Sequence, residues 1–146
     1  GMFEDTLSKF VLLAVYMPIV AGMGGNAATQ TLAVQVRGIA LKQIELKTAW
    51  KTLRSELGAE LNNGIINGIL VAAVVIAINH DFKVAFVLAA AMIINLLVAA
   101  TFGTIVPLIM SKFGKDPATS ATIFITTATD ILGFMAFLGL ATIVLR

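Results

Sequence analysis

Charged residues divide the chain into four long apolar segments. The uncharged stretches are residues 10–36, 61–79, 84–111 and, apart from Asp130, 117–145. A helix of about 20 mostly apolar residues crosses the hydrocarbon core of a bilayer. Lipid offers no partner for exposed backbone groups, so segments of this length and composition are expected to be helices. The pattern predicts an all-α membrane protein, a polytopic bundle of four transmembrane helices at about residues 7–36, 58–79, 84–111 and 117–145.

The overall composition excludes several other classes of protein. Hydrophobic residues make up 59% of the 146 residues and charged residues 12%, with a mean hydropathy of +0.98. Soluble domains carry about 25% charged residues, so a soluble domain, a disordered chain and a nucleic-acid-binding module are all excluded. The absence of cysteine excludes disulfides and thiolate metal sites. No Ser/His/Asp set, pair of carboxylates or phosphate-binding glycine loop is present, so an enzyme is not expected.

The basic residues predict the orientation in the membrane. Segment 37–60 holds five lysines and arginines and segment 112–116 two, whereas Lys9, Lys83 and Arg146 lie on the other side. Cytoplasmic loops carry an excess of such residues, so both segments are expected in the cytoplasm of a prokaryotic cell, with the protein in its inner membrane. Residues 37–57 are predicted to form a cytoplasmic helical extension of the second span, or a docking surface for another domain.

Both chain ends are then expected outside the cell. An external N-terminus suggests that a preceding helix is missing, and Gly1-Met2 resembles the remnant of a removed tag. We therefore expect the chain to be a fragment of a longer protein.

Asp130 is the main candidate for a functional residue. It lies 14 residues after Asp116, which places it about 21 Å along its helix, near the bilayer centre. A carboxylate at that depth costs about 2.5–3.5 kcal/mol and typically marks an ion or proton pathway. Thr126, Thr127 and Gly133 extend a polar, small-residue face around it, which predicts the wall of a wet cavity. The alternatives are a protonated Asp130 bonded to a neighbouring helix, and threonines bonded to their own backbone.

The first span contains a second candidate region. Pro18 and a cluster of glycines, among them Gly24 and Gly25, lie near its middle, and Asn26 and Gln30 continue a polar face towards the cytoplasm. This composition predicts a bent or opened helix with free carbonyl groups, which a membrane protein tolerates only where the backbone is buried or lines a water-filled cavity. Close helix packing through the glycines is the alternative.

Two polar or small-residue motifs have a structural interpretation. Gly64 and Gly68 form a GxxxG step that allows another helix to approach closely. Asn63 and Asn67, one turn apart, are expected to form hydrogen bonds across helices.

Two short motifs lie at the predicted helix ends. Asp116-Pro117 is typical of a helix start, with Asp as N-cap and Pro at the first helical position. Asp116 would also attract cations if it lay at a pore mouth. His80-Asp81 belongs to a tight external turn and is at most a weak metal ligand.

These residues predict a cation site. A single carboxylate with uncharged oxygens does not strip a strongly hydrated ion, and Mg²⁺ usually retains several waters when a protein binds it. A two-fold dimer would bring two copies of Asp130 to one axis and balance a dication. The ring of backbone carbonyls expected for K⁺ is absent from the sequence.

Several separated motifs together resemble the MgtE family of magnesium channels. Residues 18–30 read Pro-Ile-Val-Ala-Gly-Met-Gly-Gly-Asn-Ala-Ala-Thr-Gln, and residues 126–133 read Thr-Thr-Ala-Thr-Asp-Ile-Leu-Gly. The other matching motifs are Val36-Arg37-Gly38-Ile39-Ala40, Glu60 with Gly64 and Gly68, Pro107-Leu108, and Gly114-Lys115-Asp116-Pro117-Ala118. They follow the family order and cover nearly the whole chain.

The resemblance implies a homodimer with five membrane helices per chain, of which this chain has the second to the fifth. It implies that Asp130 holds hydrated Mg²⁺ at the selectivity site and that Asp116 lies near the cytoplasmic mouth. The residues implied to line the pore are Gly24, Gly25, Asn26, Gln30, Thr126, Thr127 and Gly133. The family's first helix, cytosolic N-terminal domain and CBS pair have no counterpart in these 146 residues.

The sequence therefore predicts a channel for Mg²⁺, with Mn²⁺ or other divalent cations as alternative ions. A proton-coupled divalent-cation transporter and a non-transporting membrane scaffold remain the other hypotheses.

Overall fold

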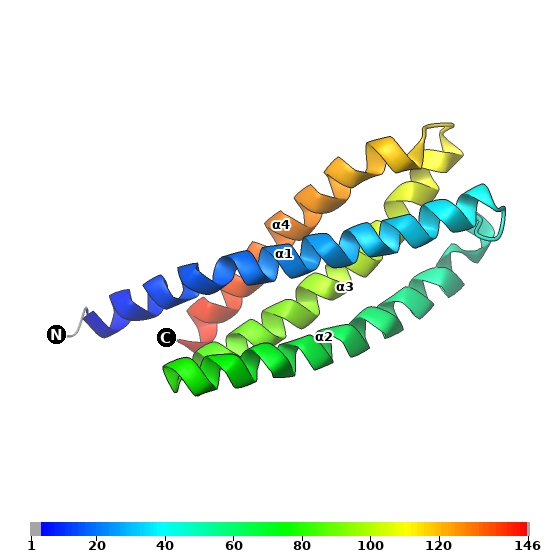
Figure 1. Ribbon diagram of the computed structural model, residues 1–146. Coiled ribbons are helices and arrows are strands. Elements are labelled where there is room, and N and C mark those ends of the chain that lie inside the picture. Colours follow the sequence, from blue (N-terminus) through cyan, green and yellow to red (C-terminus); the bar gives the residue numbers. More distant parts are fainter. Residues whose placement is uncertain (1–3, 146) are drawn as a thin grey trace.

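The computed structural model describes the backbone of residues 4–145 and the side chains of residues 11–145 (Figure 1). Gly1-Met2 and Arg146 lie outside the described residues. The described part of the chain is helical except for short connections and contains no strand. Its elements are α1 (Glu4–Ala40), the 3₁₀ helix η1 (Leu46–Thr48), α2 (Ala49–Asn79), α3 (Phe82–Lys112) and α4 (Pro117–Val144).

All four long helices have the length and composition of membrane-spanning helices. At 1.5 Å per residue they are about 42–56 Å long, against about 30 Å for the hydrocarbon core. Their outward faces carry large apolar side chains such as Ile78, Ile123 and Ile143. Trp50 and Phe113 are exposed near one end of the bundle, as expected for aromatic residues at a membrane interface. The predicted all-α, four-helix membrane bundle is confirmed.

Helix α3 is the centre of the bundle and packs against α1, α2 and α4, while α1 also packs against α4. This arrangement follows from the sequence of α3, which is the most apolar of the four spans and the most deeply buried. Gly64 and Gly68 of α2 lie against α3. A Cβ on Gly64 would come within 3.1 Å of the Ile93 Cα. A Cβ on Gly68 would come within 3.3 Å of the Ala89 carbonyl oxygen. The predicted close approach through the GxxxG step is confirmed.

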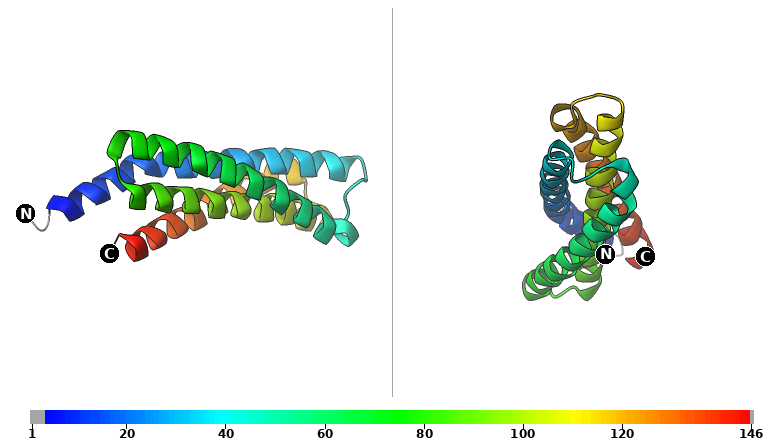
Figure 2. Two further views of the ribbon diagram at one scale, coloured as in Figure 1. Left: turned by 90° about the horizontal axis from the view of Figure 1, so that it is seen from below. Right: turned by 90° about the vertical axis from the view of Figure 1, so that its right-hand side faces the viewer.

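Both predicted cytoplasmic connections lie at the same end of the bundle (Figures 1 and 2). The α2–α3 turn and both ends of the described chain lie at the opposite end. That turn is tight: His80 ends α2 in the left-handed conformation, with a φ of 55°, and the Asp81 carboxylate accepts hydrogen bonds from the backbone N–H groups of Lys83 and Val84. The tight turn is as predicted, and its carboxylate is used as a helix cap.

The predicted helical extension of the second span over residues 37–57 is wrong for residues 37–48 and right for residues 49–57. Helix α1 ends at Ala40, the chain reverses through Lys42 (φ 55°), and α2 begins at Ala49. The turn forms because Gly38 leaves room for Ile44 to fold back onto α1, where any Cβ on residue 38 would collide with the Ile44 side chain. The backbone N–H of Gln43 also donates to the Gly38 carbonyl at 2.9 Å. Residues 49–57 are therefore the first turns of the second span.

The prediction that α1 opens at mid-depth is also wrong. The helix runs without interruption through Pro18, Gly24 and Gly25. Pro18 removes one backbone hydrogen-bond donor from the helix. Close to it, the side-chain amide of Asn95 on α3 donates a hydrogen bond to the Val20 carbonyl at 2.8 Å. Gly24 serves close packing instead, as described below, whereas a Cβ on Gly22 or Gly25 would meet no atom within 4 Å.

Candidate functional site

Asp130 lies halfway along α4 on the outer surface of the chain. Its neighbours Thr129 and Gly133 are buried against the bundle, whereas Asp130 itself is exposed. No described side chain between residues 11 and 145 donates a hydrogen bond to its carboxylate. The described part of the chain therefore leaves this carboxylate without a side-chain donor, at the depth where lipid would surround a single chain.

The threonines before Asp130 form hydrogen bonds within their own helix. The Thr126 hydroxyl donates to the Thr122 carbonyl at 2.9 Å, and the Thr129 hydroxyl donates to the Thr126 carbonyl at 2.9 Å. Thr127 is exposed on the same surface as Asp130. Thr126 therefore fits the alternative in which the threonines bond to their own backbone. A hydroxyl that donates a hydrogen bond still has lone pairs that accept hydrogen bonds from water.

A buried amide that the sequence did not single out joins the two candidate helices. Asn95, on α3, is 1% exposed and lies between Gly24 of α1 and Gly133 of α4. A Cβ on either glycine would overlap the Asn95 side chain. Both glycines are buried inside the chain, and they fix the spacing of α1 and α4 one helical turn from Asp130.

The remaining predicted pore residues of α1 have different surroundings. The Gly25 carbonyl accepts a hydrogen bond from the Thr29 hydroxyl at 2.8 Å. Asn26 and Gln30 face a groove of about 290 Å³ between α1 and α2. The structure thus separates the predicted pore residues into an exposed face of α4, a glycine contact around Asn95 and a polar groove beside α2.

The groove also contains the carboxylate of Glu60, a residue that the sequence places at the edge of the second span. Glu60 is 6% exposed, and its Oε2 atom has no hydrogen-bond partner within residues 11–145. Asn63 lies beside the carboxylate one turn along α2. The Asn67 amide donates to the Asn63 carbonyl of its own helix at 2.8 Å, so the predicted cross-helix bond is wrong for Asn67.

Asp116 is the N-cap of α4, as predicted. Its Oδ1 atom accepts a hydrogen bond from the Ala118 backbone N–H at 3.0 Å, and Pro117 occupies the first helical position. Its Oδ2 atom accepts one from the Thr119 hydroxyl at 3.2 Å. Asp116 is exposed at the end of the bundle that carries the basic connections.

Asp116→Asn separates the capping role from a role of the charge. Asn caps helices about as well as Asp, whereas Ala costs about 0.5–2 kcal/mol. We expect the thermal midpoint of the purified protein to fall for Asp116→Ala and to stay unchanged for Asp116→Asn. Reduced ion flux in the Asn variant would then report on the charge alone, and an equal loss of stability in both variants would contradict the cap.

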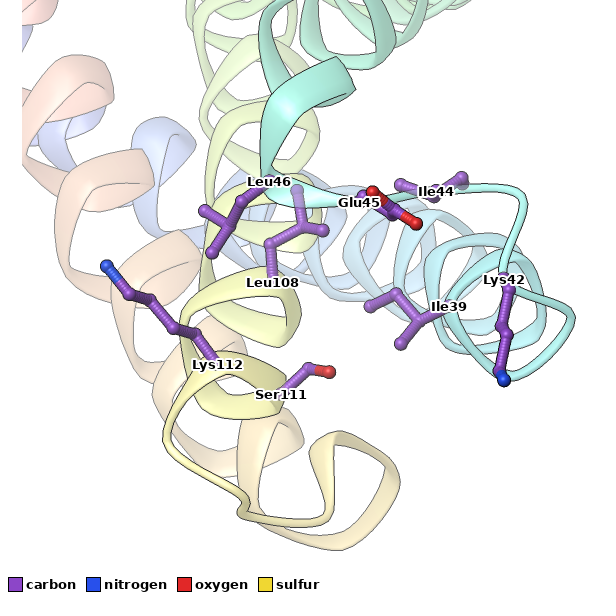
Figure 3. Close-up of a pocket in the computed structure, with 8 residues that line it drawn as sticks. All are labelled: Ile39, Lys42, Ile44, Glu45, Leu46, Leu108, Ser111 and Lys112. Atoms are coloured by element: carbon purple, nitrogen blue, oxygen red, sulfur yellow. The ribbon is translucent and has the colours of Figure 1, made fainter.

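A second hollow, of about 220 Å³, lies at the end of the bundle where the two connections meet. In Figure 3, Leu46 of η1 and Leu108 of α3 lie next to each other, while Lys42 and Lys112 lie on opposite sides of the hollow. The only other described polar side chains that line this hollow are Glu45 and Ser111. Its two lysines make the hollow unsuited to a cation.

Within the described residues, no three His, Cys, Asp or Glu side chains come together as metal ligands. Direct coordination of a metal ion by three such side chains is therefore not available within the described residues. A hydrated ion needs fewer direct protein ligands, because its own waters complete the coordination.

Comparisons with known proteins show which family the sequence resembles. The sequence profile of the MgtE family, described as "Divalent cation transporter", matches residues 17–140. The chain is 36% identical over 140 residues to the magnesium transporter MgtE of Bacillus subtilis, covering 96% of this chain and 31% of the relative. It is 33% identical over 144 residues to that of Enterococcus faecalis, covering 99% of this chain and 32% of the relative.

The magnesium transporter MgtE of Thermus thermophilus is 25% identical over 144 residues, again covering 99% of this chain and 32% of the relative. The chain spans about a third of the length of the curated relatives it matches. Because the profile matches most of the chain and two relatives exceed 30% identity, this protein belongs to the MgtE family of divalent cation transporters.

Proposed function

We propose that the chain forms the pore of a magnesium channel, through which hydrated Mg²⁺ moves down its electrochemical gradient. One observation carries the proposal: Asp130 is exposed halfway along α4 and has no donor among the described side chains. An ionisable residue within the membrane normally faces a bundle interior or a water-filled cavity. Relatives named as magnesium transporters support Mg²⁺ as the ion.

A second copy of the chain would bury this carboxylate. A two-fold axis alongside α4 would place two copies of Asp130 opposite each other, and two carboxylates balance one dication. The exposed apolar residues that flank Asp130 on α4, such as Ile123 and Ile131, supply surface for that contact. We therefore propose a homodimer in which α4 of each chain faces the permeation path.

The candidate residues of α4 and the two neighbouring glycines of α1 then have distinct roles in the proposed pore. Asp130 attracts the ion, and Thr126 and Thr127 present hydroxyl oxygens to its water shell. The helical carbonyl of Gly25 supplies a further acceptor from α1. Gly24 and Gly133 act indirectly, because their contacts with Asn95 set the distance between α1 and α4.

The donor set favours a hydrated ion. One carboxylate per chain and neutral oxygens offer too little negative charge to replace the six waters of Mg²⁺, which that ion releases reluctantly. Hydrogen bonds from retained waters to Asp130 and the threonine hydroxyls would recognise the hydrated ion by its size. Mn²⁺ and other divalent cations are the natural competitors in a selectivity assay.

The orientation is part of the proposal. The connections at residues 37–60 and 112–116 face the cytoplasm of a prokaryotic cell, and Asp116 lies at that mouth of the pore. Seven lysines and arginines at this end of the bundle, against three elsewhere, support the orientation.

Mg²⁺ uptake into liposomes tests the mechanism. With the protein reconstituted and a dye for Mg²⁺ inside, we expect uptake driven by the Mg²⁺ gradient and increased by an inside-negative potential. The rate should be the same with and without a pH gradient at fixed potential. Uptake that follows the pH gradient would instead support the proton-coupled transporter, and no uptake from protein that is folded would support the scaffold.

A further inference from the structure

Helices α1 and α2 are joined by hydrogen bonds near both ends of their shared length and are separated between them. At one end the Tyr16 hydroxyl donates to Oδ1 of Asn79, and at the other the Gln35 amide donates to Oε1 of Glu56 at 3.4 Å. Between these bonds lies the groove of about 290 Å³, whose floor is Leu96 of α3. The polar side chains along it are Asn26, Gln30, Glu60, Asn63 and Asn67.

Among the described residues, Glu60 is the only charged one that lines this groove, and no positively charged one lines it. Its Oε2 atom is buried and has no hydrogen-bond partner among the described residues, and residues 10–36, 61–79 and 84–111 contain no lysine, arginine or histidine. A buried ionised carboxylate is costly unless a cation or hydrogen bonds compensate it. Glu56, one turn away, adds to the negative potential around it.

Its depth also sets the groove apart from an ordinary surface site. Glu60 lies 19 residues before the end of α2, or about 29 Å, which is close to the full thickness of the hydrocarbon core. It therefore lies at the edge of the hydrocarbon nearest the two basic connections, where an ion from that side meets it first.

We propose that this groove binds a second divalent cation, in a site separate from Asp130. Glu60 supplies the charge, and the side-chain oxygens of Asn26, Gln30 and Asn63 supply neutral acceptors for the ion or its waters. Hard oxygen donors of this kind suit Mg²⁺, which is commonly held by one or two carboxylates and retained waters. Six waters occupy roughly 180 Å³ at about 30 Å³ each, so the hydrated ion fits the volume.

The site does not depend on the proposed pore function. It lies between α1 and α2, whereas Asp130 lies on α4, and binding is measurable without transport. The same groove would remain a cation site if the protein were a coupled transporter. A proton on Glu60 is the competing state, and it predicts no metal binding here.

Mn²⁺ binding to the purified protein tests the proposal, with free Mn²⁺ measured by electron paramagnetic resonance and Mg²⁺ as competitor. We expect Asp130→Asn protein to retain Mn²⁺ binding that Mg²⁺ displaces. Adding Glu60→Gln, which preserves the side-chain shape, should weaken that binding at least about tenfold. Equal binding in Asp130→Asn and in the double variant would overturn the proposal, as would complete loss of binding in Asp130→Asn alone.

Two neighbouring amides provide a matched control for the effect of folding. In the Asp130→Asn background, Asn63→Ala removes a group from the groove, whereas Asn62→Ala removes an exposed amide that does not line it. We expect weaker Mn²⁺ binding from the first variant and unchanged binding from the second. Equal effects of the two variants would contradict the site even if Glu60→Gln failed to fold.

Discussion

Replacing Asp130 by Asn is expected to abolish Mg²⁺ flux and to leave the folded bundle intact. The side chain keeps its size but loses its charge, and an NH₂ group replaces one of the two acceptor oxygens. Asp130 is exposed in the chain and accepts no hydrogen bond from a described side chain, so the stability of the chain should change by less than about 0.5 kcal/mol. Two unit charges 4 Å apart interact by about 4 kcal/mol at an effective dielectric constant of 20. Loss of that attraction predicts a fall in flux of at least about a hundredfold.

The liposome assay described above measures this effect, with Asp81→Asn as the matched control. Asp81 is a carboxylate too, but it lies at the membrane boundary, where it caps α3 at the end of the bundle away from the basic connections, and Asn retains the capping function. The control should conduct like the unmodified protein. Unchanged flux in Asp130→Asn would remove Asp130 from the permeation path and with it the central observation behind the channel.

The four spans could be predicted because lipid imposes a length on uncharged segments. Observed helix ends differ from the predicted ends by a few residues at most, except at the start of α2. That exception has a tertiary cause: residues 41–48 contain no Gly or Pro to mark a turn, and the reversal depends on Ile44 packing into the space left by Gly38. Such a contact between two segments of the chain leaves no periodic pattern of apolar residues in the sequence.

The sequence could predict a residue of the candidate site only where its charge set that residue apart from the rest of an apolar span. Asp130 is a charge within an apolar helix, and its position alone identified it. Asn95 is a neutral amide in a span of similar length, and its role depends on facing a glycine from each of two other helices. Glu60 stands next to the charged connection and marked the edge of a span, so its burial in a groove could not be inferred.

Replacing Gly24 by Ala is the second substitution with a large expected effect, here on stability. The new Cβ would occupy the position of the Asn95 amide, so Asn95 must move and lose its hydrogen bond to the Val20 carbonyl. Overpacking a core costs about 1–3 kcal/mol, and an unsatisfied buried polar group costs a similar amount. The better helix propensity of Ala returns at most about 1 kcal/mol. We expect a net loss of about 2 kcal/mol.

The adjacent glycine provides the matched control. A Cβ added to Gly25 would meet no atom within 4 Å, so Gly25→Ala should be neutral or slightly stabilising. Thermal unfolding in detergent, followed by the helical circular dichroism signal, compares the two variants directly. Equal midpoints for the two variants would show that the contact between Gly24 and Asn95 does not limit stability.

A double substitution tests whether Asn95 is the cause. Once Asn95→Ala has removed the amide, Gly24→Ala no longer has a side chain to displace, so most of its cost should disappear. The same reasoning applies to Gly133→Ala on α4, whose Cβ would come within 2.7 Å of the Asn95 amide carbon. For residues in direct contact, we expect a coupling free energy of at least about 1 kcal/mol in each of the two double-mutant cycles. Additive effects would mean that the glycines tolerate the added methyl group by moving their helices, and that the spacing of α1 and α4 beside Asp130 is set elsewhere.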